Sequence, residues 1–292
     1  MQETGSNIKP CMSEYKTIID ETLDFNKSKQ YRMSILFIKS GLSFVILDSQ
    51  AKKVIAHKYI PISDAESSKE YCFFVNKVLK NEEFLQYQYE KISIAFQGGK
   101  SIMVPENLYS DVYKTKFFEL NLGLEVTEEI VLNRISQMNS RKLFSVPKCI
   151  IELLESNLAS AKLFHHTTAI IQNVLKNKLF DTVFVDLNKE FFDIQVFDKS
   201  KMLLDNAFKY KSKEDLLYYI LYTFEQLDLN PKTQKIILTS SFENLTEEIT
   251  FLRKYLGELS LANYPKQFNY SYLFSKELSH KIANQILLFE CE

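Results

Sequence analysis

The chain has 292 residues, 46% of them hydrophobic and 25% charged, a composition typical of a soluble globular protein with one large domain or two modest ones. Basic and acidic residues number 36 and 37, and the resulting net charge of −1 argues against nucleic acid or an anionic membrane as a partner. Only six glycines are present. Phosphate-binding loops need glycine for close backbone approach, so the composition disfavours a nucleotide-dependent enzyme.

The cysteines and the N-terminal segment indicate a reducing compartment. Cys11, Cys72, Cys149 and Cys291 lie far apart without a CxxC motif, which predicts free thiols. The N-terminal segment has neither the basic nor the apolar region of a signal peptide. No apolar run approaches the roughly 18 residues that a membrane helix needs. We therefore expect a cytoplasmic protein that does not contact a membrane.

The first half of the chain begins with a polar leader, residues 1–30, and continues as three short strands, a helix and a strand. The three β-branched and aromatic segments are separated by turn residues, which predicts an antiparallel meander. Helical spacing after an acidic, serine-rich start predicts the helix. The strands are expected at 33–40, 42–49 and 51–62, the helix at 64–81 and the fourth strand at 91–97.

The middle of the chain combines helices with strand-to-helix junctions. Helical spacing predicts a helix over 105–123. In "KLFSVPKCIIELLESNL" a strand gives way to a helix at Pro147, because proline suits the first helical turn. The segment "AKLFHHTTAIIQNVLKNKL" has the same form, with Thr167 or Thr168 as the expected cap.

The opening pattern then returns in the last third of the chain. Three strands, a helix and a strand recur from Thr182, in the order that begins near Met33. This repeat of topology predicts two similar lobes, residues 31–178 and 179–292, although an α+β protein could repeat the order by chance. The second set is expected at 181–188, 190–198, 201–210, 212–229 and 234–241, with a further helix at 244–259.

The doubled pattern resembles the actin, sugar-kinase and heat-shock ATPase superfamily, whose lobes are ribonuclease H-like. The segment "HHTTAIIQNVLKNKLFDTVFVDLNKEFFDIQVFDKSKML" is similar to the heat-shock ATPase region "EPTAAAL…DLGGGTFDVSIL". Asp186-Leu187 stand at its DL and Phe192-Asp193-Ile194 at its FDV, with Thr167-Thr168-Ala169 in the preceding helix start. The segments "ILFIKSGLSFVIL" and "KIILTSSFENL" resemble the first phosphate segment and the adenosine segment.

This resemblance extends from Met33 onward and also includes a family of uncharacterised bacterial proteins assigned to the same fold. It implies an α/β protein with a two-lobed actin-like ATPase fold. Each ribonuclease H-like lobe would contain a mixed sheet, built on an antiparallel three-strand meander, and flanking helices.

The residues expected to bind nucleotide depart from the family pattern. Such binding needs backbone amides presented by turns that tolerate positive φ, and an aspartate that organises hydrated magnesium. Lys39 stands where the first aspartate belongs, and three non-glycine residues, 188–190, follow the surviving Asp186. Glu190 would also repel a phosphate that Lys39 attracts. The altered or vestigial cleft positions are Lys39, Ser40, Gly41, Asp186, Asn188, Lys189, Ser240 and Ser241.

Three other motifs favour structural roles. Gly99-Lys100-Ser101 resembles the end of a P-loop, but Ile94 occupies the required glycine and "IMVP" follows in place of a helix, so a hairpin turn at Gly98-Gly99 is expected. His165 and His166 point to opposite faces of an extended segment, which favours hydrogen-bonded or solvated histidines over a chelating pair. Asp186 and Asp193 lack the further acids of a two-metal nuclease.

The function expected from these observations is that of a non-catalytic, actin-like scaffold or adaptor. Its 23 Phe and 16 Tyr residues either fill the core or form a surface for another protein. The role would be comparable, by analogy only, to that of the actin-like platform proteins of secretion and pilus assembly, and no cofactor is expected. The alternative is a switch that binds ATP with magnesium through altered contacts, and a nuclease is a weaker candidate. A cleft closed by side chains favours the scaffold, whereas an open polar pocket favours the switch.

Overall fold

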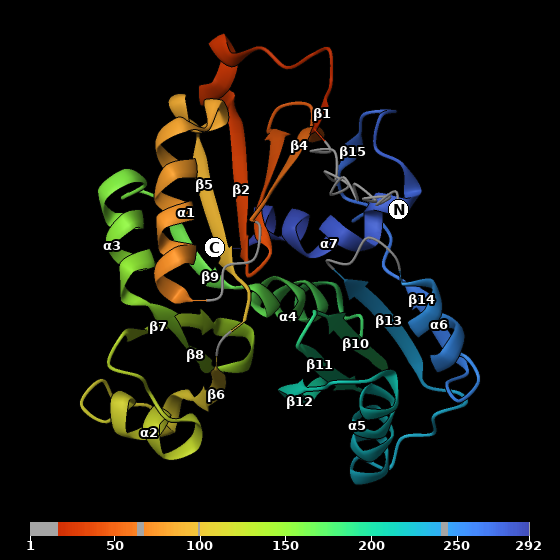
Figure 1. Ribbon diagram of the computed structural model, residues 1–292. Helices are drawn as coiled ribbons and strands as arrows, with labels where there is room; N and C mark the ends of the chain where they lie inside the picture. The colour runs from red at the N-terminus through yellow and green to blue at the C-terminus, as the bar shows by residue number, and fades with distance from the viewer. Residues whose placement is uncertain (1–16, 63–66, 99, 241–244, 292) are drawn as a thin grey trace, which may run out of the picture.

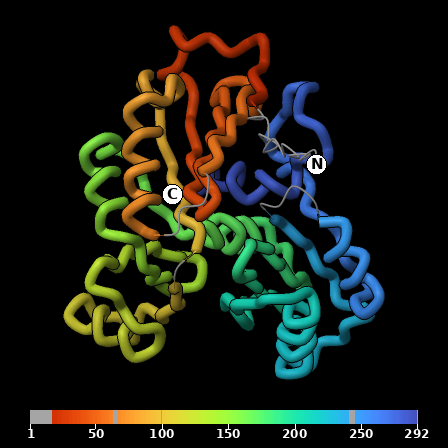
Figure 2. Tube along the Cα trace, in the orientation of Figure 1, coloured from red at the N-terminus to blue at the C-terminus, as the bar shows by residue number. Residues whose placement is uncertain are grey.

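The computed structural model describes residues 17–62, 67–98, 100–240 and 245–291, and in them helices and sheets stack in alternating layers (Figures 1 and 2). Helices α1 and α3 cover the outer face of the first sheet, and α5 and α6 cover the outer face of the second. Helices α4 and α7 lie between the two sheets. The helices are α1 Ser68–Asn81, α2 Lys114–Leu122, α3 Lys148–Asn157, α4 His166–Asn177, α5 Lys213–Gln226, α6 Thr246–Leu252 and α7 Ser279–Leu287.

The two large sheets repeat one topology, which confirms the predicted fold class. In each, three consecutive strands form an antiparallel meander, and a strand that follows a helix pairs parallel with the first. The first sheet has the order β1-β4-β3-β2-β5-β9 with β15 beside β4, and the second the order β12-β11-β10-β13-β14. The strands of the first are β1 Thr17–Ile19, β2 Tyr31–Ile38, β3 Gly41–Asp48, β4 Lys53–Pro61, β5 Lys91–Phe96, β9 Lys162–His165 and β15 Asn269–Tyr270; those of the second are β10 Thr182–Leu187, β11 Phe191–Asp198, β12 Lys201–Lys209, β13 Lys235–Ser240 and β14 Glu258–Leu261.

The central strands are buried on both faces, because helices cover each sheet on either side. On β2, Met33 and Ile35 face the cluster with α1 and α3, whereas Leu36 and Ile38 face the cluster with α4 and α7. Successive side chains of a strand point to opposite faces, so a strand between two helical layers needs an almost continuous apolar sequence. The runs "SILFI" and "TVFV" satisfy this requirement.

A small third sheet, not predicted from the sequence, extends from the first lobe. Its order is β6-β8-β7, and α2 packs against it. Gly98 therefore precedes a change of sheet, and the predicted hairpin between the flanking strands is wrong, since β6 pairs with β8 and not with β5; Gly99 itself lies outside the described residues. The strands are β6 Ser101–Pro105, β7 Glu128–Ile135 and β8 Ser140–Pro147.

Three predicted helix positions are corrected by the structure. The helix expected over 105–123 is restricted to α2, after a short 3₁₀ turn at Glu106–Leu108. The helix expected over 244–259 is restricted to α6 and is followed by β14. Just before β14, the chain at Gly257 passes so close to Lys232 that a Cβ atom would lie 1.8 Å from its carbonyl oxygen. The N-cap of α4 is His165 in place of the expected threonines.

Two cysteines that the sequence predicts to be free are joined in the structure. Cys72 on α1 and Cys149 on α3 form a disulfide, with their Cα atoms 6.2 Å apart. The two cysteines are separated by 77 positions in the sequence, and no local pattern indicated their pairing, which depends on the packing of α1 against α3. Cys291 is a buried free thiol, and Cys11 lies outside the described residues.

Both ends of the described chain add to the first sheet. Thr17–Ile19 of the predicted leader form β1, which pairs with β4; residues 1–16 of the leader lie outside the described residues. Near the C-terminus, β15 also pairs with β4, and α7 packs on Val45 and Leu47. The division expected at residue 179 assigned this C-terminal segment to the second lobe, whereas it contacts the first sheet directly. No helix in the described ranges combines the length and apolar character needed to cross a bilayer.

Replacement of Ile286 tests the contribution of α7 to the first-lobe core. This side chain has no exposed surface and packs with Val45 and Leu47. Ile286→Ala is expected to lower the free energy of unfolding by about 2–5 kcal/mol, because it removes buried methyl groups and leaves a cavity. Urea unfolding measures the change, with Leu273→Ala as a control since Leu273 is 40% exposed. Equal losses in the two variants would contradict the placement of α7 in the core.

Candidate functional site: a buried histidine–aspartate cluster

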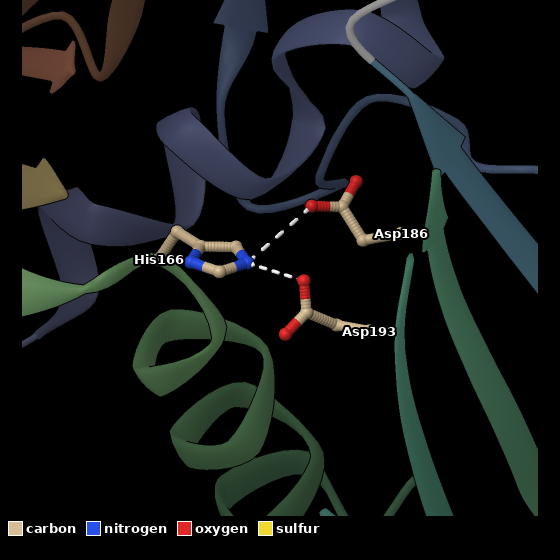
Figure 3. A group of neighbouring side chains, drawn as sticks. All are labelled: His166, Asp186 and Asp193. Carbon is tan, nitrogen blue, oxygen red and sulfur yellow. Dashed lines mark hydrogen bonds and ion pairs between the residues drawn. The ribbon is translucent and has the colours of Figure 1, made fainter. Parts of the chain in front are cut away.

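His166 is positioned by the junction of β9 with α4. The strand ends at His165, whose backbone N–H donates to Asn133 Oδ1 over 2.8 Å and whose ring nitrogen Nδ1 accepts from the Thr167 backbone N–H. This side-chain cap satisfies one of the free N–H groups at the start of α4. The helix therefore begins with His166, and the imidazole ring of His166 extends toward the second sheet (Figure 3).

Two aspartates on adjacent strands face this ring. Asp186 on β10 and Asp193 on β11 lie directly opposite each other in the antiparallel register. The His166 Nε2 atom lies 2.8 Å from Asp193 Oδ2 and 3.7 Å from Asp186 Oδ2 (Figure 3). All three residues are at most 4% exposed. The cluster thus places two carboxylates and an imidazole in an environment almost free of solvent.

The partners of the ring fix where its protons lie. His166 Nδ1 is 3.3 Å from the carbonyl oxygen of Phe96, which can only accept, so Nδ1 carries a hydrogen. A hydrogen bond between Nε2 and Asp193 then needs a second proton, either on the ring or on the carboxyl group. The cluster therefore holds one proton in addition to the one on Nδ1.

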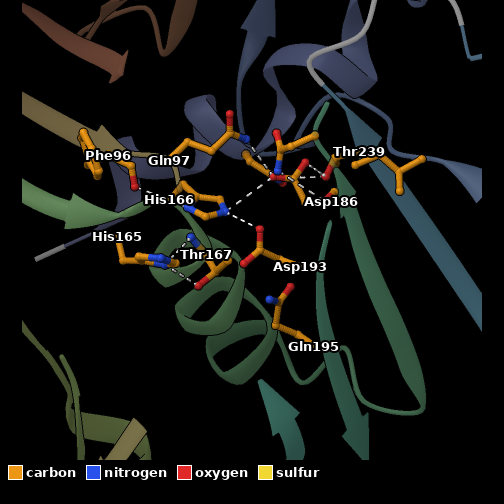
Figure 4. Close-up of polar contacts among 12 residues, drawn as sticks. Phe96, Gln97, His165, His166, Thr167, Asp186, Asp193, Gln195 and Thr239 are labelled. Atoms are coloured by element: carbon orange, nitrogen blue, oxygen red, sulfur yellow. Dashed lines mark hydrogen bonds and ion pairs between the residues drawn. The ribbon is translucent and has the colours of Figure 1, made fainter. Parts of the chain in front are cut away.

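Further hydrogen bonds orient Asp186. Thr239 Oγ1 on β13 donates to Asp186 Oδ1 over 2.6 Å, and Gln97 Nε2 donates to Asp186 Oδ2 over 3.1 Å (Figure 4). Asn284 on α7 in turn donates to Thr239 Oγ1 over 2.9 Å. Gln97 follows β5 of the first sheet, so Asp186 joins residues from both lobes and from the helical layer between them.

Burial and charge shift the pKa values in this cluster. Burial lowers the pKa of His166, but the adjacent Asp193 and Asp186 carboxylates outweigh it and raise the pKa above its ordinary value. Burial raises the pKa of Asp186, and the nearby Asp193 charge adds to this effect, while His166, Thr239 and Gln97 oppose it. Both shifts favour retention of the shared proton.

The residues predicted in the first lobe lie in the turn between β2 and β3. Lys39 Nζ is 2.6 Å from Glu190 Oε1, in the corresponding turn of the second lobe. Ser40 accepts hydrogen bonds from Tyr59 at its carbonyl oxygen and at Oγ. Gly41 has φ +152° and begins β3, where a Cβ atom would lie 2.2 Å from the Ile60 carbonyl oxygen. The turns of the two lobes therefore meet through an ion pair.

The residues predicted in the second lobe have separate environments. Asn188 is buried, and its backbone carbonyl accepts a hydrogen bond from Tyr210 over 2.6 Å. Lys189 is exposed. Ser240 is buried and donates to the Leu187 carbonyl oxygen over 3.0 Å, and Ser241 lies outside the described residues. Asp186 is the predicted residue that belongs to the buried cluster.

A cavity of about 20 Å³ adjoins the cluster between the lobes. Its lining includes His166 and Asp186 on the side of the second lobe and Leu36 and Ala95 on the side of the first. Leu36 pairs with Ser43 across the hairpin and with Ala95 in the parallel ladder, as Asp186 pairs with Asp193 and Thr239. Leu36, and not Lys39, thus holds the cavity-facing place in the first lobe that Asp186 holds in the second.

The sequence drew attention to Asp186, Asp193 and His166 separately but not to their contact. A spacing of seven residues correctly places the two aspartates on adjacent strands, whereas His166 comes from a helix 20 residues earlier. Gln97 and Asn284 carry no local motif, and Thr239, although it lies in the segment that resembles the adenosine segment, was not singled out. Only the packing of the helical layer against both sheets brings them together.

Comparisons with known structures define the class of protein as one with an actin-like ATPase fold. A protein of unknown function from Bacteroides thetaiotaomicron VPI-5482 that has this fold superposes with a TM-score of 0.74 at 24% identity, covering 92% of this chain and 99% of that one. The PilM–PilN type IV pilus biogenesis complex matches with a TM-score of 0.58 at 11% identity, covering 88% and 97%. The ethanolamine utilization protein EutJ from Carboxydothermus hydrogenoformans gives 0.51 at 11%, covering 93% and 92%.

The chain belongs to the family described as "Protein of unknown function (DUF3822)", whose model matches residues 20–259. A comparison with functionally curated proteins gives no significant match. At these identities the structural likeness shows a shared fold and no more.

The raised pKa of His166 predicts a specific pH dependence of stability. The folded state binds this proton more tightly than the unfolded state, so its contribution is complete below pH about 6.5 and is lost as the pH rises through the folded pKa. In metal-free buffer containing EDTA, the free energy of unfolding is expected to fall over that range. Asp193→Asn should reduce the fall, since burial then dominates and lowers the pKa of His166.

Urea unfolding at a series of pH values and NMR titration of the His166 ring measure these effects. His280→Gln serves as the control because burial lowers the pKa of His280, which is then neutral above pH 6.5 in both states. A His166 pKa below 6.5 in the unmodified chain would contradict the assigned balance of charges.

Proposed function

We propose that this protein is a non-catalytic scaffold or adaptor that uses the actin-like fold to bind another protein. The observation that carries the proposal is the small cavity between the lobes. Its volume of about 20 Å³ accommodates about one water molecule, whereas small-molecule and cofactor sites typically enclose about 300–1,000 Å³. This cavity, as the described residues form it, is therefore too small for a nucleoside triphosphate in this conformation.

Side chains at the two turns support the same proposal. The Lys39 ammonium, which could attract a phosphate, is paired with Glu190 of the opposite lobe. Both side chains are more than 60% exposed, so water screens the pair and it contributes little to stability. The pair matters because the Glu190 carboxylate occupies the position beside Lys39, where an anionic ligand would need hydrogen-bond donors.

An exposed apolar surface around α2 supports a protein partner. Leu120 and Val126 are 87% and 89% exposed, and Leu108, Val112 and Tyr113 are also exposed. These residues lie within 108–126, on the small lobe extension that protrudes beside the second sheet (Figure 1). Exposed apolar patches on soluble proteins are characteristic of protein-binding sites. We infer that an apolar segment of the partner binds here, and the PilM–PilN complex is a precedent for a partner protein on this fold.

A nucleotide-binding switch is the second candidate, and the polar groups around Asp186 favour it. Asp186, Gln97, Thr239 and Asn284 form a hydrogen-bonded network between the lobes. A separation of the lobes would expose these groups to a ligand. The switch therefore requires an open conformation, and a nucleotide that stabilises this conformation would reveal it.

Thermal unfolding with magnesium nucleotides distinguishes the two candidates. We expect no change in the midpoint with millimolar Mg-ATP, Mg-ADP or Mg-GTP. A ligand present at 100 times its Kd and bound only to the folded state would add about 2.7 kcal/mol, which is a readily measured shift. A nucleotide-dependent rise that is absent in Asp186→Asn would establish the switch and overturn the scaffold.

Lysine substitutions on the α2 surface test the partner site. Leu120→Lys and Val126→Lys should each leave the unfolding midpoint almost unchanged, because both side chains are exposed, and should weaken the partner complex at least tenfold. The measurement is affinity capture with mass spectrometry, followed by a binding titration with the purified candidate partner.

The matched control is Tyr218→Lys on α5, since Tyr218 is also an exposed large side chain, 61% accessible, but on the other lobe. It is expected to retain binding. A partner that binds all three variants as tightly as the unmodified chain would place the interface elsewhere.

A further inference from the structure

We propose that His166, Asp186 and Asp193 form a binding site for a divalent transition-metal cation. Each residue offers one donor atom, and the three atoms lie within 4.8 Å of one another. The donors come from the first residue of α4 and from adjacent positions on β10 and β11, and they converge from two sides (Figure 3). This inference is independent of the proposed scaffold function.

The donor spacing suits a metal after small displacements. Zinc binds histidine nitrogen and carboxylate oxygen at about 2.0–2.2 Å, which places neighbouring donors about 3–4 Å apart at ordinary coordination angles. His166 Nε2 lies 3.7 Å from Asp186 Oδ2 and 2.8 Å from Asp193 Oδ2. All three donor atoms lie within 4.8 Å of one another, so the ion requires the His166–Asp193 contact to lengthen by a few tenths of an ångström and the two carboxylates to turn toward a common point.

The groups that surround the donors are those that orient metal ligands. A metal-binding histidine ordinarily donates its second ring N–H to a carbonyl or carboxylate, and His166 Nδ1 faces the Phe96 carbonyl oxygen. Binding carboxylates are ordinarily hydrogen-bonded in turn, as Asp186 is by Thr239 and Gln97 (Figure 4). These contacts direct His166 Nε2 and the Asp186 carboxylate toward one point.

The adjoining cavity provides a place for a further ligand. It is lined by His166 and Asp186, and its volume of about 20 Å³ is sufficient for one water molecule. Three protein ligands and one water complete the four-coordinate arrangement that zinc adopts in open sites. Without the cavity, the buried cluster could offer only an incomplete shell.

The charge of the site and the donor types narrow the choice of cation. Two carboxylates and a neutral imidazole would carry two negative charges, which one divalent ion balances. The imidazole favours Zn²⁺ or Co²⁺ over the hard cations Mg²⁺ and Ca²⁺, and the two carboxylates also suit Mn²⁺. Lys281 also lines the cavity. Lys142 on β8 is paired with Asp205, and its positive charge disfavours a further positive charge at His166. Their positive charges reduce the affinity, so we expect binding in the micromolar range rather than the tightness of a zinc finger.

Titration of the EDTA-treated, dialysed full chain with ZnCl₂ and MnCl₂ tests the site. Calorimetry is expected to give one ion per chain, with release of about one proton, because the metal replaces the proton shared by the cluster. Saturating ZnCl₂ should also raise the thermal midpoint, and CoCl₂ should give the visible absorption of a four- or five-coordinate ion.

Ligand variants separate this site from adventitious binding. Asp193→Asn and His166→Gln are expected to weaken Zn²⁺ binding at least tenfold, whereas Asp198→Asn, the same change on the same strand outside the cluster, should retain it. Circular dichroism and urea unfolding without metal establish that each variant is folded; should His166→Gln fail to fold, Asp193→Asn carries the test. Absence of binding to the unmodified chain, or equal affinity in Asp193→Asn, would overturn the proposal.

Discussion

The arrangement of this protein depends on a shared layer of helices between two sheets. Each large sheet is apolar on both faces, so both faces must be covered by other elements. The same two helices, α4 and α7, cover the inner faces of both sheets. On α4, Ala169 packs toward the first sheet and Ile170 and Val174 toward the second. A helix that is buried on opposite sides cannot move relative to one sheet without disturbing the other. The shared layer therefore fixes how the two lobes approach each other.

The polar residues in this layer follow from the same constraint. A buried polar group is costly unless it is hydrogen-bonded; the helical layer contains His166 and Gln285, and the second sheet presents Asp186 and Asp193 to it. Gln285 of α7 donates to the carbonyl oxygens of Ser34 and Ser43, so it attaches the helix to β2 and β3 of the first sheet. His166 attaches α4 to the second sheet through Asp193. These contacts orient the helices where apolar packing alone would allow them to slide.

The two lobes repeat one topology but differ at the positions that face each other. Asp186 in the second lobe is opposed by Leu36 in the first, and the turns beyond them meet as Lys39 and Glu190. A symmetric pair of carboxylates would need a cation or protons between the lobes. With an apolar residue on one side, the carboxylates of the other lobe instead share one proton with His166. This asymmetry explains why the polar cluster belongs to one lobe and to the intervening helix.

Two further contacts constrain how the elements pack: one joins the outer helices α1 and α3 of the first lobe, and the other joins the small sheet to the second lobe. The disulfide between Cys72 and Cys149 joins the two outer helices. Lys142 on β8, fully buried, pairs with Asp205 on β12 and so connects the small sheet to the second lobe. Removal of one partner of such a buried pair leaves an uncompensated charge, so the pair strongly restricts alternative lobe positions.

Local sequence determined the repeated elements, because apolar runs, turn residues and helical spacing act over a few residues. It predicted the meanders beginning at Met33 and Thr182, the helices after them and the adjacent strands that carry Asp186 and Asp193. It missed β7 and the small sheet, since β6 finds its partner β8 only after a long connection. The contact of His166 with both aspartates, the disulfide and the return of α7 to the first sheet were decided by tertiary structure. Each joins residues whose proximity depends on how layers pack, and no local pattern encodes that distance.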